Sequence, residues 1–370
     1  MSNIVPPAGA WTRAAPDEVG MDRDRLAEAV AFAQAHEHSS PRDLALALQS
    51  ALFEPPPWNE PLGPLFPRGP ANGCVIRGGR LAATWGDGGA NTADLTFSVA
   101  KSYLAVLAGV AVDRGLIRSE HDRCADYAFD DGFASPQNRD VTFAQLLQQT
   151  SEWEGECWGR PDLVDRNRRL GVLGPANTMK GQHRDLRRPG EYWEYNDVRV
   201  NRLSRTLMQV FRRPLPDVLR EAIMEPIGAT DGWIWHGYRT SFETIDGRAL
   251  QGVPGGTHWG GGLQISAMDQ ARLGLLVLRR GDWAGRRLLS EAWIERMTAP
   301  CPRNRVYGYL WWLNTRGDQH PSAPGSCVYA YGANGNVIYV DFEHDLVVVA
   351  RWIADEAIDG LLRRVIASLR

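Results

Sequence analysis

Lysine is almost absent from this chain. Lysine and arginine together number 41, and lysine stands at only two positions, Lys101 and Lys180, so the other 39 (41 − 2) are arginine. An arginine side chain keeps its proton in proteins, whereas a buried lysine can lose its proton and act as a base. The preference for arginine elsewhere indicates that lysine serves a chemical purpose at position 101, where an apolar segment begins.

Other absences exclude several classes of function. The formal net charge of −3 gives no general attraction to nucleic acid or to an anionic membrane. The first residues lack the basic and apolar parts of a signal peptide, and no segment is typical of a membrane span, so we expect a cytoplasmic protein. The five cysteines are odd in number and scattered, which excludes a disulfide framework and a zinc motif. Glycine-rich phosphate loops are absent as well, and we expect neither a metal nor another cofactor.

The segment at 96–112, TFSVAKSYLAVLAGVAV, is the most informative part of the chain. It is apolar on nearly every side after Lys101, which predicts a helix buried inside a domain. Thr96 is a candidate N-cap and Gly115 a candidate stop signal. Ser98 and Lys101 are three residues apart, so they lie on one face of the first turn.

A serine and a lysine at this place can form a nucleophilic site. A serine hydroxyl becomes a good nucleophile when a base takes its proton, and burial and the positive end of a helix both lower the pKa of a lysine. The spacing therefore predicts Ser98 as the nucleophile, Lys101 as its base and the Ser98 N–H as an oxyanion donor. In the alternative, Lys101 only extends from the helix start to solvent and Ser98 has no chemical role.

The rest of the chain has strands early, helices in the middle and strands late. The elements that we expect are a helix at 22–36, a hairpin at 74–86, helices at 142–149, 199–210, 214–224 and 266–280, strands at 307–314, 327–331, 336–341 and 346–352, and a helix at 355–369. The late strands are joined by short turns, so they pair antiparallel.

This order predicts an α/β fold of the α+β type, in which an antiparallel sheet flanked by helices is built from both chain ends. Residues 1–122 and 245–370 form this sheet domain, and residues 123–244 form an inserted, mostly helical domain. The active site is expected at the interface of the two.

Four segments resemble one known superfamily. SVAK at 98–101 resembles the Ser-x-x-Lys signature of the serine β-lactamases and penicillin-binding proteins. Three further segments follow in that superfamily's order: LLQQTS at 146–151, RPGEYWEYND at 188–197, and GGGL with DQARLG between 260 and 274. Together they are most similar to the branch related to class C β-lactamases. GECWGRPD at 155–162 and HWGGG at 258–262 resemble its esterases and 6-aminohexanoate-dimer hydrolase.

The resemblance implies a β-lactamase/transpeptidase-like fold and roles for individual residues. Ser98 would be the nucleophile, Lys101 its base partner, and Tyr195 the tyrosine that relays protons to the leaving group. The backbone N–H groups of Ser98 and Ala333 would hold the oxyanion. The substrate-binding residues that we expect are Asp197, Trp153, Trp158, His258, Trp259, Tyr331 and Gly332.

Two positions depart from the superfamily pattern. Ala330 stands where the relatives have a lysine or histidine that helps to hold a substrate carboxylate, and this weakens a reading as an antibiotic-hydrolysing or cell-wall enzyme. Asp197 stands where they have an asparagine, and a carboxylate near Lys101 would favour the charged lysine. Asp197 can bind a cationic substrate group or cap the following helix, and Asn196 can have taken the asparagine's place.

The leading hypothesis is a serine hydrolase that forms an acyl-enzyme with a small ester or amide. The alternatives are a β-lactamase or D,D-peptidase, a transacylase, and a non-catalytic sensor with the same fold. A pyridoxal-phosphate enzyme with Lys101 as its Schiff base also fits the spacing. The expected partner is a small molecule, not nucleic acid or membrane, and the sequence leaves the oligomeric state open.

Overall fold

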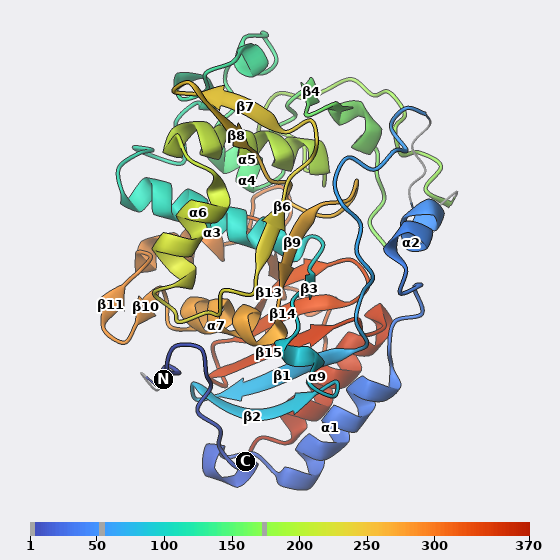
Figure 1. The fold of residues 1–370 in the computed structure, drawn as a ribbon, viewed down its shortest axis with the longest axis vertical. Coiled ribbons are helices and arrows are strands. Elements are labelled where there is room, and N and C mark those ends of the chain that lie inside the picture. Colours follow the sequence, from blue (N-terminus) through green and yellow to red (C-terminus); the bar gives the residue numbers. More distant parts are fainter. Residues whose placement is uncertain (1–3, 52–55, 172–175) are drawn as a thin grey trace.

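The computed structural model describes residues 4–51, 56–171 and 176–370. Its centre is a six-stranded antiparallel sheet with the strand order β12-β13-β14-β15-β1-β2 (Figure 1). The strands are β1 (Asn72–Arg77), β2 (Arg80–Trp85), β12 (Trp312–Leu313), β13 (Val328–Gly332), β14 (Asn336–Asp341) and β15 (Leu346–Arg351). β1 pairs with β15, with Asn72 opposite Arg351. The two chain ends therefore meet inside one sheet, and the predicted fold class is confirmed.

Helices cover both faces of this sheet, which explains the composition of its central strands. They are α1 (Arg23–Ala35) and α9 (Ile358–Ala367) on one face, and α7 (Ala267–Leu278) and α3 (Val99–Asp113) on the other (Figure 1). β14 and β15 are buried at every position, as strands rich in β-branched residues are when both faces are covered. Alternation along β13 places Tyr329 on the α1/α9 face and Ala330 on the α3/α7 face.

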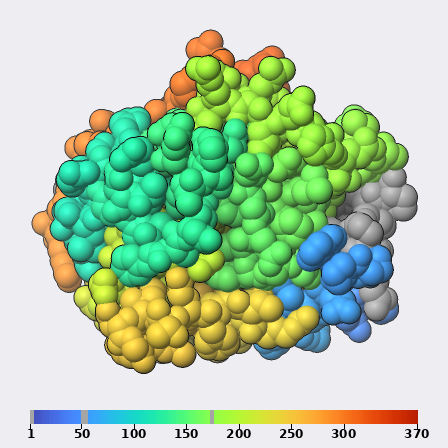
Figure 2. Space-filling view, turned by 90° about the horizontal axis from the view of Figure 1, so that it is seen from above, coloured from blue at the N-terminus to red at the C-terminus, as the bar shows by residue number. Residues whose placement is uncertain are grey.

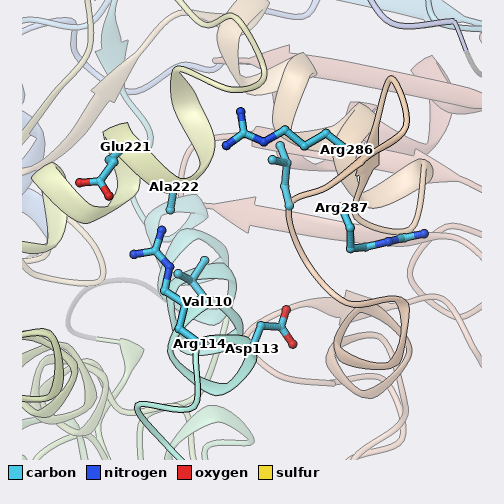
Figure 3. Close-up of a pocket in the computed structure, with 8 residues that line it drawn as sticks. Val110, Asp113, Arg114, Glu221, Ala222, Arg286 and Arg287 are labelled. Carbon is cyan, nitrogen blue, oxygen red and sulfur yellow. The ribbon is translucent and has the colours of Figure 1, made fainter.

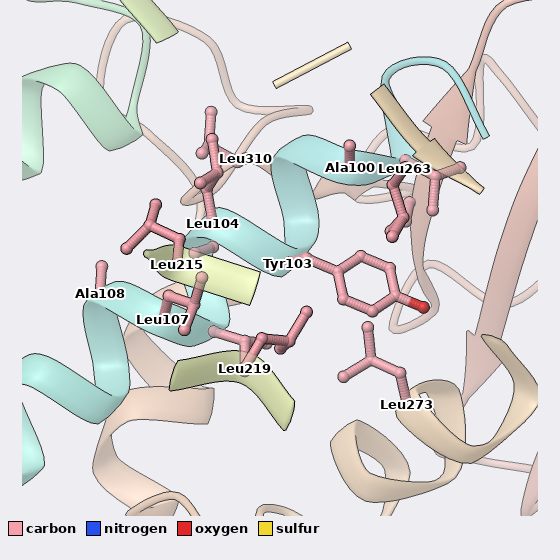
Figure 4. Packing of buried hydrophobic residues seen from close by; sticks show 14 of the residues in the cluster. Ala100, Tyr103, Leu104, Leu107, Ala108, Leu215, Leu219, Leu263, Leu273 and Leu310 are labelled. Atoms are coloured by element: carbon pink, nitrogen blue, oxygen red, sulfur yellow. The ribbon is translucent and has the colours of Figure 1, made fainter. Parts of the chain in front are cut away.

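α3 is the buried helix that the sequence predicts. All residues from 99 to 111 are buried. Figure 4 shows Leu104 and Leu107 of α3 beside Leu215 and Leu219, which belong to the helical part of the chain, residues 123–244. The prediction of Thr96 as N-cap is wrong, because Ser98 occupies the N-cap position and its side chain makes no capping hydrogen bond. This leaves the Ser98 hydroxyl available for other contacts. In the described part of the chain, no helix is both long and apolar enough to cross a bilayer.

The helical part lies at the end of the molecule away from α1 and α9, and Figure 2 views that end from above. The remaining elements are α2 (Leu44–Ala51), α4 (Phe143–Leu147), α5 (Asp197–Phe211), α6 (Leu215–Leu219), α8 (Glu291–Met297), β3 (Asp94–Leu95), β4 (Glu156–Cys157), β5 (Arg160–Pro161), β6 (Ile234–His236), β7 (Phe242–Ile245), β8 (Arg248–Gln251), β9 (Gly262–Ile265), β10 (Asp282–Trp283) and β11 (Arg286–Arg287). Three strands, in the order β3-β9-β6, form a small sheet beside the start of α3. The hairpin of β7 and β8 spans the predicted boundary at 244/245, and the division into domains stays a prediction.

Local signals account for most element ends. The side chains of Thr142 and Ser266 cap α4 and α7 by accepting hydrogen bonds from backbone N–H groups three residues on. Gly115 follows α3 in the left-handed region, with a φ of 69°. The strand predicted at 307–314 is reduced to β12, because Leu310 has a φ of 55° and an extended chain cannot continue through that conformation.

One buried histidine makes the fold sensitive to acid. The His320 ring packs edge-on against Tyr329, and neither ring nitrogen has a hydrogen-bond partner among the described residues. Burial lowers the pKa of His320 from 6.5 to about 4. Below pH 6.5 the unfolded chain therefore binds a proton that the folded chain does not, and stability falls as the pH drops toward 4.

We predict that His320→Phe removes this loss. Between pH 7 and pH 4, the wild-type free energy of unfolding should fall by about 3 kcal/mol more than that of the variant, since a pKa difference of this size has that value. Urea unfolding at a series of pH values measures it. Equal pH dependence in the two proteins would show that His320 is not buried in its neutral form.

Candidate active site

Ser98 and Lys101 are in direct contact at the start of α3. The Lys101 ammonium donates a hydrogen bond to Ser98 Oγ over 2.7 Å. Lys101 is 1 % exposed, whereas Ser98 is partly exposed. Phe97, just before the serine, has a φ of 50°, which is a strained conformation for a bulky residue and is common at functional sites. The predicted serine–lysine pair is therefore formed, with the serine on the accessible side.

The surroundings of Lys101 keep it positively charged. Its Nζ lies 2.5 Å from Asp197 Oδ1 and 4.9 Å from the centre of the Tyr195 ring. Burial acts to lower the pKa of Lys101, as the sequence predicts, but the Asp197 carboxylate and the Tyr195 hydroxyl outweigh burial and raise it above its usual value. The resting site thus holds an ammonium rather than a neutral amine.

Asp197 is shared among several cations. Besides Lys101, its carboxylate contacts Arg168 Nη1 at 2.7 Å and His258 Nδ1 at 3.3 Å. Although burial acts to raise the pKa of Asp197, these neighbours hold it well below its usual range. The Asp197 carboxylate is therefore already paired within the protein. Asn196 supplies the N-cap of α5, accepting the N–H groups of the second and third residues after it, so the helix does not need Asp197 as its cap.

A second buried carboxylate, that of Asp165, extends this cluster. Asp165 Oδ1 lies 3.4 Å from Lys180 Nζ and 3.6 Å from Arg168 Nη1, and Asp165 Oδ2 accepts the backbone N–H of Asp197. Lys180 Nζ also lies 3.5 Å from His258 Nε2. Both lysines of the chain therefore belong to one group of charged side chains. The sequence contained this signal, since Lys180 is the second exception in a chain of arginines.

The same cluster offers three potential metal ligands. Donor atoms of Asp165, Asp197 and His258 lie within 4.8 Å of one another. Both carboxylates already contact lysine or arginine side chains at hydrogen-bonding or ion-pair distances, and a divalent cation would have to displace these charges. The arrangement favours an ion-pair network over a metal centre.

The end of β13 lies directly against the serine. A Cβ placed on Gly332 would overlap the Thr96 carbonyl oxygen and lie 3.1 Å from the Ser98 nitrogen. Only a glycine allows this close approach of the two backbones. Ala333 is the next residue, and its proposed oxyanion role stays a prediction.

The glycine-rich segment at 254–262 faces the pair from another side. A Cβ on Gly256 would lie 3.3 Å from Lys101 Nζ and 3.5 Å from Ser98 Oγ. A side chain at this position would therefore occupy the space beside the nucleophile. His258 belongs to the same segment, which explains how it reaches Asp197.

The aromatic residues around Tyr195 differ from those that the sequence suggested. Trp312 stacks on the Tyr195 ring with centroids 6.0 Å apart, and Trp193 and Tyr307 pack against both rings. Sequence reasoning missed these three, although Trp193 stands two residues before Tyr195 in the quoted segment at 188–197. Tyr307 and Trp312 come from the distant segment at 307–314, and no motif singles them out. Trp193 and Trp312 are partly exposed and can contact a bound molecule.

The aromatic residues expected to line a pocket have other surroundings. Trp153 is buried and donates its indole N–H to the Gly132 carbonyl. Trp158 packs edge-on against Tyr238, and Trp259 is fully buried beside His258. The Tyr331 side chain lies on the α1/α9 face of the sheet, away from α3. Of the predicted substrate-binding residues, the structure brings Asp197 and His258 to the Ser98–Lys101 pair, with Gly332 against the Ser98 backbone.

A separate cavity of about 330 Å³ lies at the other end of α3 (Figure 3). It is lined by the last residues of α3, by Arg114 and by β11. α3 has 15 residues, so about 20 Å of helix separates this cavity from Ser98. It is not part of the serine–lysine site.

Comparisons with known proteins identify the family and the fold of the chain. The family model described as Beta-lactamase matches residues 71–352. The chain belongs to this family. Membership of this family places the chain in a superfamily of serine hydrolases. A search of curated proteins finds no match.

Solved structures show the same fold at low sequence identity. A penicillin-binding protein homologue from Caulobacter crescentus has a TM-score of 0.61 and 18 % identity, over 95 % of this chain and 99 % of that one. A candidate 6-aminohexanoate-dimer hydrolase from Bacillus anthracis has a TM-score of 0.54 and 14 % identity, over 98 % and 97 %. A family VIII carboxylesterase has a TM-score of 0.54 and 19 % identity, over 81 % and 92 %.

We predict that Asp197→Asn destabilises the protein across the neutral pH range. The Lys101–Asp197 ion pair stabilises the fold above the usual aspartate pKa near 4, and it loses this effect as the pH falls below that value. On the other side, its effect is present below the usual lysine pKa near 10.4 and is lost as the pH rises further. Removing one partner of a buried pair should cost about 3–5 kcal/mol.

Urea unfolding at pH 7 measures this loss. Asp231→Asn is the control, because it removes an exposed carboxylate that pairs with Arg220 at the surface. Equal stability of the two variants would contradict a buried Lys101–Asp197 ion pair.

Proposed function

We propose that the protein is a serine hydrolase that forms an acyl-enzyme with a small ester or amide. The observation that carries this proposal is the contact of Ser98 Oγ with Lys101 Nζ at 2.7 Å, at the start of a buried helix whose serine remains accessible. A hydroxyl beside a lysine that can lose its proton is an activated nucleophile. Membership of the Beta-lactamase family supports the same reaction class.

The proposed acylation begins from the fraction of protein in which Lys101 is neutral. Lys101 takes the Ser98 proton while Ser98 Oγ bonds to the carbonyl carbon, and the N–H groups of Ser98 and Ala333 hold the oxyanion. When the bond to the leaving group breaks, Tyr195 gives its proton to that group and regains one from Lys101. Water then attacks the acyl carbon, the bond from that carbon to Ser98 Oγ breaks, and one proton of the water passes to Oγ as the acid product leaves.

Esters and simple amides fit this site better than β-lactams. Position 330 carries an alanine, fully buried on the α3/α7 face, so it offers no cation for a substrate carboxylate. The solved structures of similar fold include a family VIII carboxylesterase and a candidate 6-aminohexanoate-dimer hydrolase beside β-lactamases, so they allow this preference and do not carry it. A transacylase, in which an alcohol or amine replaces water as the acceptor, would use the same residues.

The first test is covalent labelling of Ser98. Incubation with a fluorophosphonate should add one phosphonyl group to the wild-type protein and none to Ser98→Ala, since the adduct needs the activated hydroxyl. Ser102→Ala is the matched control, because Ser102 lies in the same helix but its hydroxyl donates to the Leu310 carbonyl. It should label normally. Intact mass spectrometry gives the answer, and labelling of folded Ser98→Ala would refute the assignment of the nucleophile.

A second test separates the substrate classes. We expect p-nitrophenyl esters of short acids to be hydrolysed at least about 100-fold faster than Ser98→Ala allows, because removal of a nucleophile loses several orders of magnitude in rate. Nitrocefin should be turned over slowly or not at all. Rapid nitrocefin hydrolysis together with inert esters would instead favour the β-lactamase alternative.

A further inference from the structure

The only two lysines of the chain meet in one cluster, although they are 79 positions apart in sequence. Lys180 is largely buried and reaches Asp165 and His258. The chemistry proposed for Ser98 uses Lys101 and leaves Lys180 without a role. A second lysine in an otherwise arginine-based chain, placed beside the first, calls for a physical explanation.

A continuous series of contacts joins Lys180 to the nucleophile. Lys180 Nζ lies 3.5 Å from His258 Nε2, and His258 Nδ1 lies 3.3 Å from Asp197 Oδ2. The other oxygen of Asp197 lies 2.5 Å from Lys101 Nζ, which is 2.7 Å from Ser98 Oγ. One tautomer of His258 satisfies both contacts: Nε2 accepts from the Lys180 ammonium, and Nδ1 carries the proton that is directed at Asp197.

This geometry makes His258 a competitor of Lys101 for one carboxylate. Each hydrogen bond or cation on Asp197 reduces the negative potential that Lys101 experiences, and so makes the Lys101 proton easier to lose. Lys180 acts in the same direction twice. It orients His258 toward Asp197, and its charge offsets that of Asp165.

We propose that Lys180, acting through His258 and Asp197, is a positioning residue that weakens the hold of Asp197 on the Lys101 proton and thereby prepares the base for Ser98. The effect on rate rests on the proposed function, whereas the effect on Lys101 itself does not. Lys180 does not touch the reacting atoms in this account.

Other charged groups face the same cluster and must remain unchanged in a test. Arg168 contacts both carboxylates and lies over the Tyr195 ring. Tyr195 faces Lys101, and the phenols of Tyr238 and Tyr307 lie near enough to interact with Asp197. Only substitutions at Lys180 and His258 change the proposed path while leaving these groups in place.

The scarcity of lysine makes the test direct. In Lys180→Met and in Lys180→Arg, Lys101 is the sole lysine, so protein labelled with ¹³C-lysine and carrying no lysine in a tag gives one side-chain signal to titrate. Lys180→Met removes the charge and Lys180→Arg keeps it. Lys101 should hold its proton to a pH about one unit higher in Lys180→Met than in Lys180→Arg, as expected for loss of a nearby partly buried charge.

The rate should follow the titration. On the rising part of the pH profile, kcat/KM of Lys180→Met should be about tenfold lower than that of Lys180→Arg. A shift of one pH unit in the Lys101 titration changes the neutral fraction of Lys101 by this factor. His258→Asn is a second variant, and should also raise the pH at which the rate rises. Arg286→Met in the Lys180→Arg protein removes one charge beside the distant cavity, and should change neither readout.

The outcomes distinguish the two proposals. A higher Lys101 titration in Lys180→Met than in Lys180→Arg, both with native circular dichroism, supports the inference. Identical titration curves overturn it, whatever reaction the protein catalyses. If the curves differ but Ser98→Ala keeps full hydrolytic activity, the inference about Lys101 stands and the proposed function fails.

Discussion

The ion pair between Lys101 and Asp197 is the contact on which the rest of the site depends. α3 is buried on all sides, and a lone ammonium at its first turn would carry a large desolvation cost. Asp197 removes this cost from the start of α5, where Asn196 takes over the capping of the helix. Asp197 is itself buried and needs further partners, and its contacts with Arg168 and His258 provide them.

The fold serves to bring these pieces together from distant parts of the chain. The sheet joins both chain ends and presents the end of β13 to the Ser98 backbone, where Gly332 permits close approach. In the small sheet of β3, β9 and β6, strand β3 leads into α3 and strand β9 follows the glycine-rich segment. Nucleophile, charge network and glycine-rich segment therefore meet at one end of a buried helix.

Sequence reasoning succeeded where the signal is local. The helices expected from 22, 142 and 266 begin there, where Asp22, Thr142 and Ser266 cap them, and the hairpin expected at 74–86 forms from β1 and β2. The charge state of Lys101 was harder, because burial and a carboxylate 96 residues away act in opposite directions and only the observed 2.5 Å distance decides between them. The surroundings of the tryptophans were not predictable either, since an indole packs equally well in a core or at a pocket wall.

A measurement of the Lys101 charge in the resting wild-type protein tests the role of the Lys101–Asp197 ion pair most directly. With two lysines in the chain, ¹³C-lysine labelling gives two side-chain signals, and Lys180→Arg identifies the one that belongs to Lys101. We predict that Lys101 is an ammonium at neutral pH and remains one beyond pH 10.4, the usual pKa of a lysine. A Lys101 signal that is already that of a neutral amine at pH 7 would contradict the central role given to Asp197.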